Sequence, residues 1–261
     1  MASQSSNSTI NCEVVVVGSG NAGFSAAISA AQSGAGRVVL IDKCPEEWAG
    51  GNSHFTAGAF RTVHTGLPDI LPLVNNVDSA TASTIDLEPY SRDDFLSDLS
   101  RMTEGRHEPE LGRTLVEESN DVVKWLARNG VRFQLAFNRQ AYKIDGRFKF
   151  WGGMCLKTED GGEGLINDHQ RVAKRLGVKV LYETAATCLH LDPKNGAFES
   201  LLASDREGKS LLINAKAVIL AGKRLMILSK SLTNIFELRD LIFNCKSSWL
   251  KKLLLFELSL L

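Results

Sequence analysis

The chain has 261 residues, and its thirty basic and thirty acidic side chains leave a formal net charge of zero at pH 7. A hydrophobic content of 44% is typical of a globular protein, and the lack of a net positive charge argues against a nucleic-acid partner. The cysteines form no C-x-x-C pair and the histidines show no ligand spacing, so we expect neither a disulfide framework nor a metal site.

The first residues of the chain are polar and rich in Ser and Asn. Residues 1–11 lack the basic and apolar regions of a signal peptide, and no stretch of the chain is apolar for long enough to span a membrane. We therefore expect a disordered segment at 1–11 and a cytoplasmic protein without a membrane span.

A glycine-rich turn follows the first predicted strand. Residues 13–17 read EVVVV, a run typical of a buried parallel strand, and the next six residues, GSGNAG, lead into an alanine-rich helix. This is the G-x-G-x-x-G pattern in its required context of strand, turn and helix. Gly18 would permit the turn, Gly20 would let the backbone approach a pyrophosphate, and Gly23 would let helix and strand pack closely.

A carboxylate ends the second predicted strand, which covers residues 37–41. Asp42 lies 19 residues beyond Gly23, close to the spacing at which an acidic residue receives the ribose hydroxyls of an adenine nucleotide. Its negative charge would repel a 2′-phosphate, which argues against NADP. Strand, turn, helix, strand and acid together predict an adenine dinucleotide site.

A second glycine-rich loop, GGNSHFTAG, covers residues 50–58. Bare backbone can approach a ligand there as well. A nicotinamide dinucleotide does not need this second loop, whereas an extended flavin dinucleotide uses more backbone donors along its length. The loop therefore favours a flavin, although a nicotinamide-dependent dehydrogenase stays open.

The motifs VVVVGSGNAG and IDKCPEEWAGGNS resemble the flavoprotein subunit of fumarate reductase and succinate dehydrogenase, in the soluble branch that includes tricarballylate dehydrogenase and the 3-ketosteroid dehydrogenases. The spacing between Asp42 and Asn52 is most like tricarballylate dehydrogenase. The resemblance continues through residues 125–134, 161–192 and 214–221. It implies an FAD-dependent dehydrogenase or reductase that passes hydride between the flavin and a small di- or tricarboxylate.

The resemblance also implies which residues contact the FAD. These are Gly18, Gly20, Asn21, Ala22, Gly23, Asp42, Lys43, Gly51, Asn52, Ser53, Ala57, Gly58, Gly162, Gly164 and Ala186. Succinate dehydrogenases attach the flavin through a histidine in the second loop. Alignment on the small residues at 57 and 58 places Ser53 there instead of His54, so we expect noncovalent FAD. A solvent-exposed turn at 161–164, and an ordinary sheet residue at Ala186, stay open as alternatives.

The remaining pattern predicts further elements in chain order. Residues 59–110 are loop-rich, and the other predicted elements are helices at 93–102, 110–129 and 161–176, a hairpin around Asp145-Gly146, a buried strand at 178–182, a small antiparallel sheet from 186–191, 201–204 and 211–213, and a core strand at 216–221. We expect an α/β fold in which a Rossmann-like parallel sheet carries helices on both faces and is crossed by the small antiparallel sheet.

The family pattern stops after the last predicted strand. In the family a further glycine turn follows, whereas Lys223-Arg224 stand here, and residues 223–261 form a Leu- and Lys-rich tail without family resemblance. We therefore expect residues 12–222 to be the N-terminal part of an FAD-binding domain in a truncated, inactive chain. His107, Arg139 and Arg147 are candidate carboxylate ligands, but no catalytic residue is assigned. A noncatalytic nucleotide-binding fragment and a flavin 3-ketosteroid dehydrogenase stay open, and so does the oligomeric state.

Overall fold

The computed structural model describes residues 8–222, so the predicted tail at 223–261 and residues 1–7 lie outside the described residues. The described chain divides into two compact units, one made of residues 8–52 and 169–222 and the other of residues 53–168. The chain thus leaves the first unit and returns to it. Within residues 8–222, no helix combines the length and apolar character that crossing a membrane requires.

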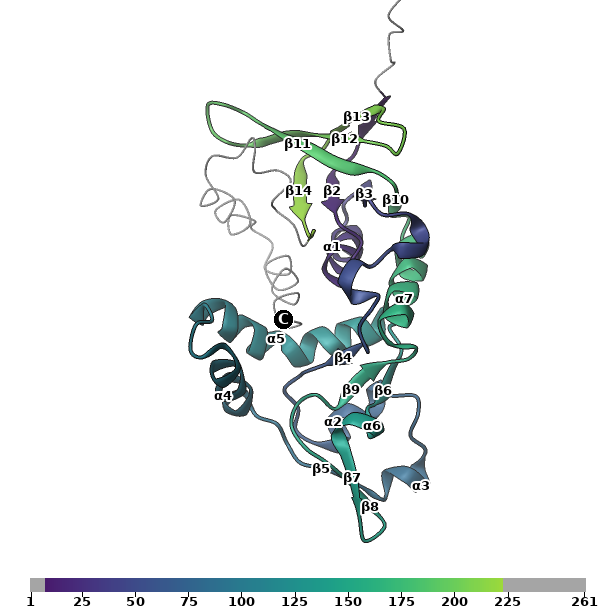
Figure 1. The fold of residues 1–261 in the computed structure, drawn as a ribbon, viewed down its shortest axis with the longest axis vertical. Coiled ribbons are helices and arrows are strands. Elements are labelled where there is room, and N and C mark those ends of the chain that lie inside the picture. The colour runs from purple at the N-terminus through teal and green to yellow at the C-terminus, as the bar shows by residue number, and fades with distance from the viewer. Residues whose placement is uncertain (1–7, 223–261) are drawn as a thin grey trace, which may run out of the picture. The chain divides into compact units, whose positions relative to one another are not determined.

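A four-stranded parallel sheet forms the centre of the first unit (Figure 1). Its strands, in spatial order, are β10 (Lys179–Leu181), β3 (Val38–Ile41), β2 (Val14–Val17) and β14 (Ala217–Leu220). Helix α1 (Asn21–Gln32) connects β2 to β3 and packs against both strands. The predicted parallel sheet and its first helix are confirmed. The strand predicted as buried at 178–182 lies instead at an edge of the described sheet, with half-buried and exposed side chains.

A second sheet of the same unit contains β1 (Ser8–Asn11), β13 (Ser210–Asn214), β12 (Phe198–Ser204) and β11 (Ala185–Leu191), in that spatial order. Strand β1 pairs parallel to β13, and the other pairs are antiparallel. The expectation of disorder at 1–11 is therefore wrong for residues 8–11. The backbone of residues 8–11 pairs with β13, and Ile10 packs on the core. The polar side chains of Ser8, Thr9 and Asn11 are exposed, as an edge strand allows.

The two sheets of the first unit share a hydrophobic core. Side chains from β2 and β3 meet side chains from β12 and β13 in one cluster, whose buried members are Val15, Val39, Ile41, Leu201, Ala203 and Ile213. Val16 and Leu40, which alternate with them on the other face, are also fully buried. The predicted α/β class with a small antiparallel sheet is confirmed. The antiparallel sheet packs on the face of the parallel sheet that Val15, Val39 and Ile41 form.

Helix α7 (Gly161–Arg175) contributes a buried histidine to the first unit. The ring of His169 stacks on the ring of Phe24 with a centroid distance of 5.8 Å, and its Nε2 lies 2.8 Å from Oδ1 of Asn21. Because a carboxamide oxygen only accepts, Nε2 carries the proton and donates it to Asn21. Burial lowers the pKa of His169 to about 3, so the ring is neutral at physiological pH.

The second unit contains two longer helices, α4 (Arg92–Thr103) and α5 (Pro109–Arg128), which confirm the predicted helices at 93–102 and 110–129. Its sheets have the orders β4-β9-β6 and β5-β8-β7. The strands are β4 (Ala59–Phe60), β5 (Ile85–Leu87), β6 (Phe133–Leu135), β7 (Ala141–Ile144), β8 (Arg147–Phe150) and β9 (Leu156–Thr158). Strands β7 and β8 form the predicted hairpin, with positive φ at Asp145 and Gly146.

Short helices connect these elements. They are the α-helical turns α2 (Leu67–Ile70), α3 (Ser79–Ala82) and α6 (Phe137–Gln140), and the 3-10 turns η1 (Glu46–Trp48), η2 (Gly51–Ser53) and η3 (Leu71–Leu73). The prediction that residues 59–110 are rich in loops agrees with the short elements found there between β4 and α4.

We predict that Leu201→Ala destabilises the protein by about 2–5 kcal/mol, because it opens a cavity between the two sheets of the first unit. Leu202→Ala, on the opposite face of the same strand and only half-buried, is the matched control and should cost about 1 kcal/mol or less. The free energy of unfolding in urea measures both. Equal losses would show that the inter-sheet core does not stabilise the unit.

The buried His169 predicts a stability that depends on pH. Its folded pKa lies below its unfolded value near 6.5, so its contribution is fully present above about pH 6.5 and is lost as the pH falls toward about 3. From pH 6.5 to 5 we expect the free energy of unfolding to fall by about 2 kcal/mol from this group. His169→Gln keeps a donor for Asn21 but does not titrate, so its stability should fall less over this range. Identical pH profiles for the two proteins would contradict the assignment.

Candidate functional site

Two glycines of the first turn occupy positions that no other residue fits. Gly18 has φ of 106°, and a Cβ there would lie 3.0 Å from the backbone of Ala221 and Gly222. A Cβ on Gly23 would lie 1.8 Å from the carbonyl oxygen of Gly18, well inside contact distance. The close approach of α1 to the end of β2 therefore requires glycine at both positions. Gly20 has φ of −71°, which any residue adopts, so its backbone conformation does not require glycine.

The N-terminus of α1 is suited to an anion. Gly20 is the N-cap residue, no side chain caps the helix, and its first turn contains no acidic residue. The first N–H groups of a helix lack partners within the helix, and the helix dipole places partial positive charge beside them. Such an end is a ready site for a phosphate group. Asn21 and Ala22, both buried, begin this helix, and Asn21 is held by His169.

The carboxylate of Asp42 is tied to the same turn. Its Oδ2 accepts hydrogen bonds from the backbone N–H of Ser19 at 2.7 Å and from the Ser19 hydroxyl at 2.6 Å. Its Oδ1 accepts from the backbone N–H of Cys44 at 2.9 Å. A carboxylate can accept about four hydrogen bonds, so these three leave about one position for a ribose hydroxyl.

Ser19 is a residue that the sequence analysis missed. It is fully buried, and its Oγ also accepts from the backbone N–H of Gly50 at 3.2 Å, so it joins the first turn, Asp42 and the start of the second glycine loop. As one of the variable positions of G-x-G-x-x-G it gave no signal of its own. The pattern that could have indicated it is a serine inside the glycine turn combined with an acidic residue at the end of the next strand.

The other predicted residues of the first unit lie around this network. Lys43, Gly51 and Asn52 are exposed. Ala186 is half-buried and lies on β11 at the start of a β-bulge. Just before this strand, the backbone N–H of Thr184 donates a hydrogen bond to the carbonyl of Asp42 at 2.8 Å. The structure thus brings the start of β11 beside Asp42.

The predicted residues of the second unit form a separate packed cluster. The backbone N–H of Gly162 donates to the carbonyl of Thr56 at 2.9 Å, and a Cβ on Gly162 would lie 1.8 Å from the carbonyl oxygen of Ser53. A Cβ on Gly58 would lie 1.9 Å from Oγ1 of Thr158. Gly162, Gly164, Ser53 and Gly58 are buried, and Ala57 is exposed. The loop at 53–58 and the start of α7 therefore contact each other, and 161–164 is not a solvent-exposed turn.

The position aligned with the family's covalent attachment point is Ser53, which is buried and carries no imidazole. The neighbouring His54 is half-buried, and its ring contacts Phe55 edge-on at 4.9 Å between centroids. Within residues 8–222, no group of His, Cys, Asp or Glu side chains is placed to hold a metal ion.

Comparisons with known proteins agree with this geometry. A family model described as FAD binding domain matches residues 13–226. The vinyl phenol reductase of Lactiplantibacillus plantarum is 28% identical over 80% of this chain and 37% of its own length. A probable fumarate reductase of Shewanella frigidimarina is 25% identical over 80% of this chain and 32% of its own length. The chain thus spans about a third of the length of these curated relatives.

Solved structures show the same fold. An open conformation of a flavocytochrome c3 fumarate reductase superimposes with a TM-score of 0.59 and 24% identity, covering 81% of this chain and 33% of that chain. A 3-ketosteroid dehydrogenase from Rhodococcus jostii RHA1 superimposes with a TM-score of 0.61 and 20% identity, covering 84% of this chain and 47% of that chain. Because the family model covers most of the chain, including the glycine turn and Asp42, the chain belongs to the FAD binding domain family and is related to fumarate reductase and vinyl phenol reductase.

Proposed function

We propose that this chain holds FAD noncovalently and is part of a reductase or dehydrogenase that acts on an activated carbon–carbon double bond. The observation that carries the proposal is the bonded set of Ser19 and Asp42 beside the uncapped N-terminus of α1. It combines an acceptor for ribose with donors for phosphate, in a chain that belongs to an FAD-binding family.

The residues present fit the adenosine and pyrophosphate half of FAD. Backbone atoms occupy the space that a Cβ on Gly18 or Gly23 would fill. The turn therefore brings the start of α1 close to the end of β3, which Asp42 directly follows. The N–H groups at the start of α1 would hold the pyrophosphate, and the remaining acceptor position of Asp42 would hold a ribose hydroxyl. The Asp42 charge disfavours a 2′-phosphate at this place. When bound, the flavin supplies the capacity to accept or donate a hydride.

We assign the other predicted residues to the same cofactor. Lys43, Gly51 and Asn52 lie exposed after β3 and could contact the cofactor through their backbone, while the buried glycines at 58, 162 and 164 shape the loop that follows. Ser53 in place of a histidine supports a noncovalent flavin.

The names of two relatives support a substrate class. Vinyl phenol and fumarate, named in the two curated relatives, both carry a carbon–carbon double bond conjugated with an aromatic ring or a carboxylate. The resemblance of the 42–52 segment to tricarballylate dehydrogenase adds a carboxylic acid to this class. We therefore propose a small unsaturated compound, with a carboxylate as its recognised group.

Asp42→Asn should weaken FAD binding by about 10- to 100-fold, because hydrogen bonds to a charged group contribute about 1.5–3 kcal/mol. Ser19→Ala should weaken it less, since the backbone N–H of Ser19 still positions Asp42. The control is Asp121→Asn, an exposed position on α5. Quenching of flavin fluorescence on titration measures the affinity, and NADP should compete poorly. An unchanged affinity in Asp42→Asn would remove the basis of the proposal.

We expect the flavin to be released completely by acid precipitation, because Ser53 occupies the attachment position and His54 is directed against Phe55. Absorbance of the supernatant and of the redissolved pellet measures the distribution of flavin. Flavin colour that stays in the pellet of the unaltered chain, but is absent from the pellet of the His54→Ala variant, would show a covalent link at His54.

A further inference from the structure

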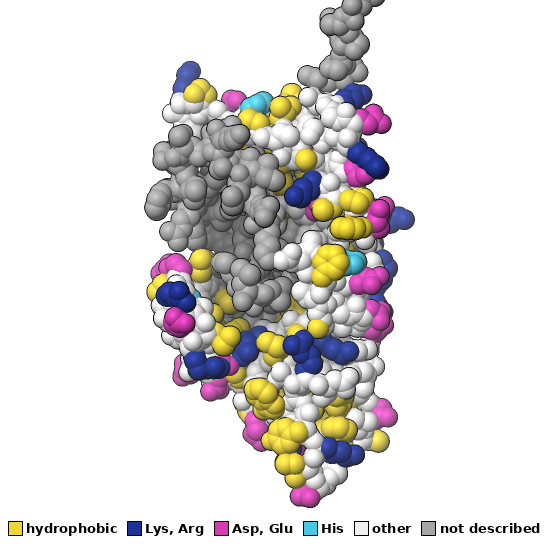
Figure 2. All heavy atoms as spheres, viewed as in Figure 1, with side chains coloured by type: hydrophobic (Ala, Val, Ile, Leu, Met, Phe, Trp, Pro, Cys, Tyr) yellow, Lys and Arg dark blue, Asp and Glu magenta, His cyan; other side chains and the backbone are white. Residues whose placement is uncertain are grey.

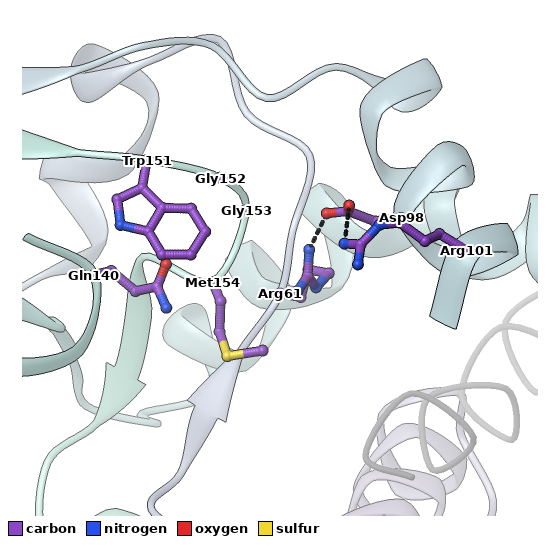
Figure 3. Close-up of a pocket in the computed structure, with 8 residues that line it drawn as sticks. All are labelled: Arg61, Asp98, Arg101, Gln140, Trp151, Gly152, Gly153 and Met154. Atoms are coloured by element: carbon purple, nitrogen blue, oxygen red, sulfur yellow. Dashed lines mark hydrogen bonds and ion pairs between the residues drawn. The ribbon is translucent and has the colours of Figure 1, made fainter. Parts of the chain in front are cut away.

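The second unit contains a pocket that the FAD assignment does not use (Figure 3). It has a volume of about 280 Å³, which is at the small end for ligand sites and too small for a dinucleotide. Arg61, Asp98 and Arg101 lie on one side of it, and Trp151 and Gln140 lie on the other. All of its lining residues belong to residues 53–168.

The charged side of the pocket has one positive charge in excess. Nη1 of Arg61 lies 2.6 Å from Oδ2 of Asp98, and Nη2 of Arg101 lies 2.8 Å from Oδ1 of the same carboxylate. The hydrogen bond from Arg101 is the main cause that lowers the pKa of Asp98, so this carboxylate is ionised at neutral pH. Two guanidinium groups thus share a single counter-charge, and the lining of the pocket contains no second carboxylate.

Arg61 is held in place before any ligand arrives. Its guanidinium carbon lies 5.8 Å from the ring centroid of Tyr90 and 5.7 Å from that of Phe95. Tyr90 Oη accepts from Arg61 and donates to Asp98, both at 2.8 Å, and burial raises the pKa of Tyr90 to about 12, so it stays a donor. A guanidinium presents five N–H donors, and the hydrogen bonds of Arg61 to side chains of residues 8–222 use Nη1 alone. The fork geometry of the remaining donors suits a carboxylate.

The opposite side of the pocket contains the planar indole of Trp151, with the carboxamide of Gln140 beside it. Trp151 is 60% exposed, which is unusual for so large an apolar side chain, and the Met154 side chain extends into the space between it and Arg61. Two glycines permit this arrangement: Gly152 has φ of 68°, and a Cβ on Gly153 would lie 2.2 Å from the ring of Tyr90. Figure 2 shows Lys and Arg side chains beside exposed hydrophobic side chains on the lower part of this unit, where β7 and β8 lie.

We propose that this pocket binds a small planar unsaturated acid, with its carboxylate on Arg61 and Arg101 and its conjugated part against the indole of Trp151. One excess positive charge matches one carboxylate, whereas a tricarboxylate would bring two charges without partners. The proposal goes beyond the proposed function and does not depend on it, because every lining residue of the pocket lies within residues 53–168.

The test is calorimetric titration of the chain with cinnamate at low ionic strength, with and without saturating FAD. We expect saturable binding of cinnamate and weaker binding of three probes, namely the neutral cinnamamide, the saturated 3-phenylpropionate and the trianion trans-aconitate. Because the pocket uses only residues of the second unit, the affinity for cinnamate should be the same in both arms. A chain that binds cinnamate but no FAD would overturn the proposed function and support the pocket.

Substitutions give effects of opposite sign. Arg101→Gln should weaken cinnamate about 10-fold, because it removes a charge-assisted bond from an exposed residue of α4 without disturbing the core. Asp98→Asn should tighten cinnamate by about 3- to 10-fold, since it removes the competing carboxylate but keeps an acceptor for the arginines. Trp151→Leu should weaken cinnamate but affect an aliphatic acid such as acetate little.

The matched control is Arg113→Gln on α5, an exposed arginine that pairs with Glu110 at a distance of 3.1 Å, and it should leave the affinity unchanged. Circular dichroism of each variant confirms that it is folded. Equal affinities for cinnamate and cinnamamide, equal effects of Arg101→Gln and Arg113→Gln, or tighter binding of trans-aconitate than of cinnamate would each overturn the proposal.

Discussion

The close approach of α1 to the end of β2 is the constraint on which the nucleotide half of the structure depends. Only 1.8 Å would separate a Cβ on Gly23 from the carbonyl oxygen of Gly18, so the helix can rest on the turn only when residue 23 lacks a side chain. This contact places the uncapped N-terminus of α1 directly after the strand, at the carboxyl end of a parallel sheet where phosphate groups are commonly bound. The apolar character of α1 follows from the same geometry, because all residues from Asn21 to Ala30 are buried.

Asp42 then acts as a structural residue as well as a candidate ligand. Through Ser19 and Cys44 it accepts three hydrogen bonds from its own protein, which ties the end of β3 to the turn after β2. A carboxylate already held by donors has its orientation fixed before a ribose arrives, so less conformational entropy is lost on binding. The same bonds reduce its free acceptor positions, which favours a single hydroxyl contact over the two that the sequence pattern indicated.

The sequence predicted the elements of the first unit well where a local signal was strong. The apolar runs of β2 and β3, the glycine turn and the alanine-rich α1 each have one physical interpretation. The pairing of β1 could not be predicted, because Ser8, Thr9 and Asn11 look like a polar tail until β13, some 200 residues later, supplies the partner strand. Of the candidate carboxylate ligands, Arg147 pairs with Asp86 on β5 instead. Arg61 gave no signal, since it meets Asp98 only in the folded chain, whereas Asp98 and Arg101 lie three residues apart on one predicted helix.

The glycines of the second unit carry less information about a cofactor than their pattern indicated. Gly162 and Gly164 are required because backbone carbonyls of Ser53 and Glu159 lie where their side chains would be. Gly58 is required by Thr158 and by its positive φ. Packing alone therefore explains these residues, whether or not a ligand approaches them. At the first turn packing explains Gly18 and Gly23 in the same way, but it does not explain a helix end without a side-chain cap. The case for a cofactor thus rests on the start of α1 and on Asp42, and experiments on these positions discriminate binding from packing better than substitutions at the glycines of the second unit.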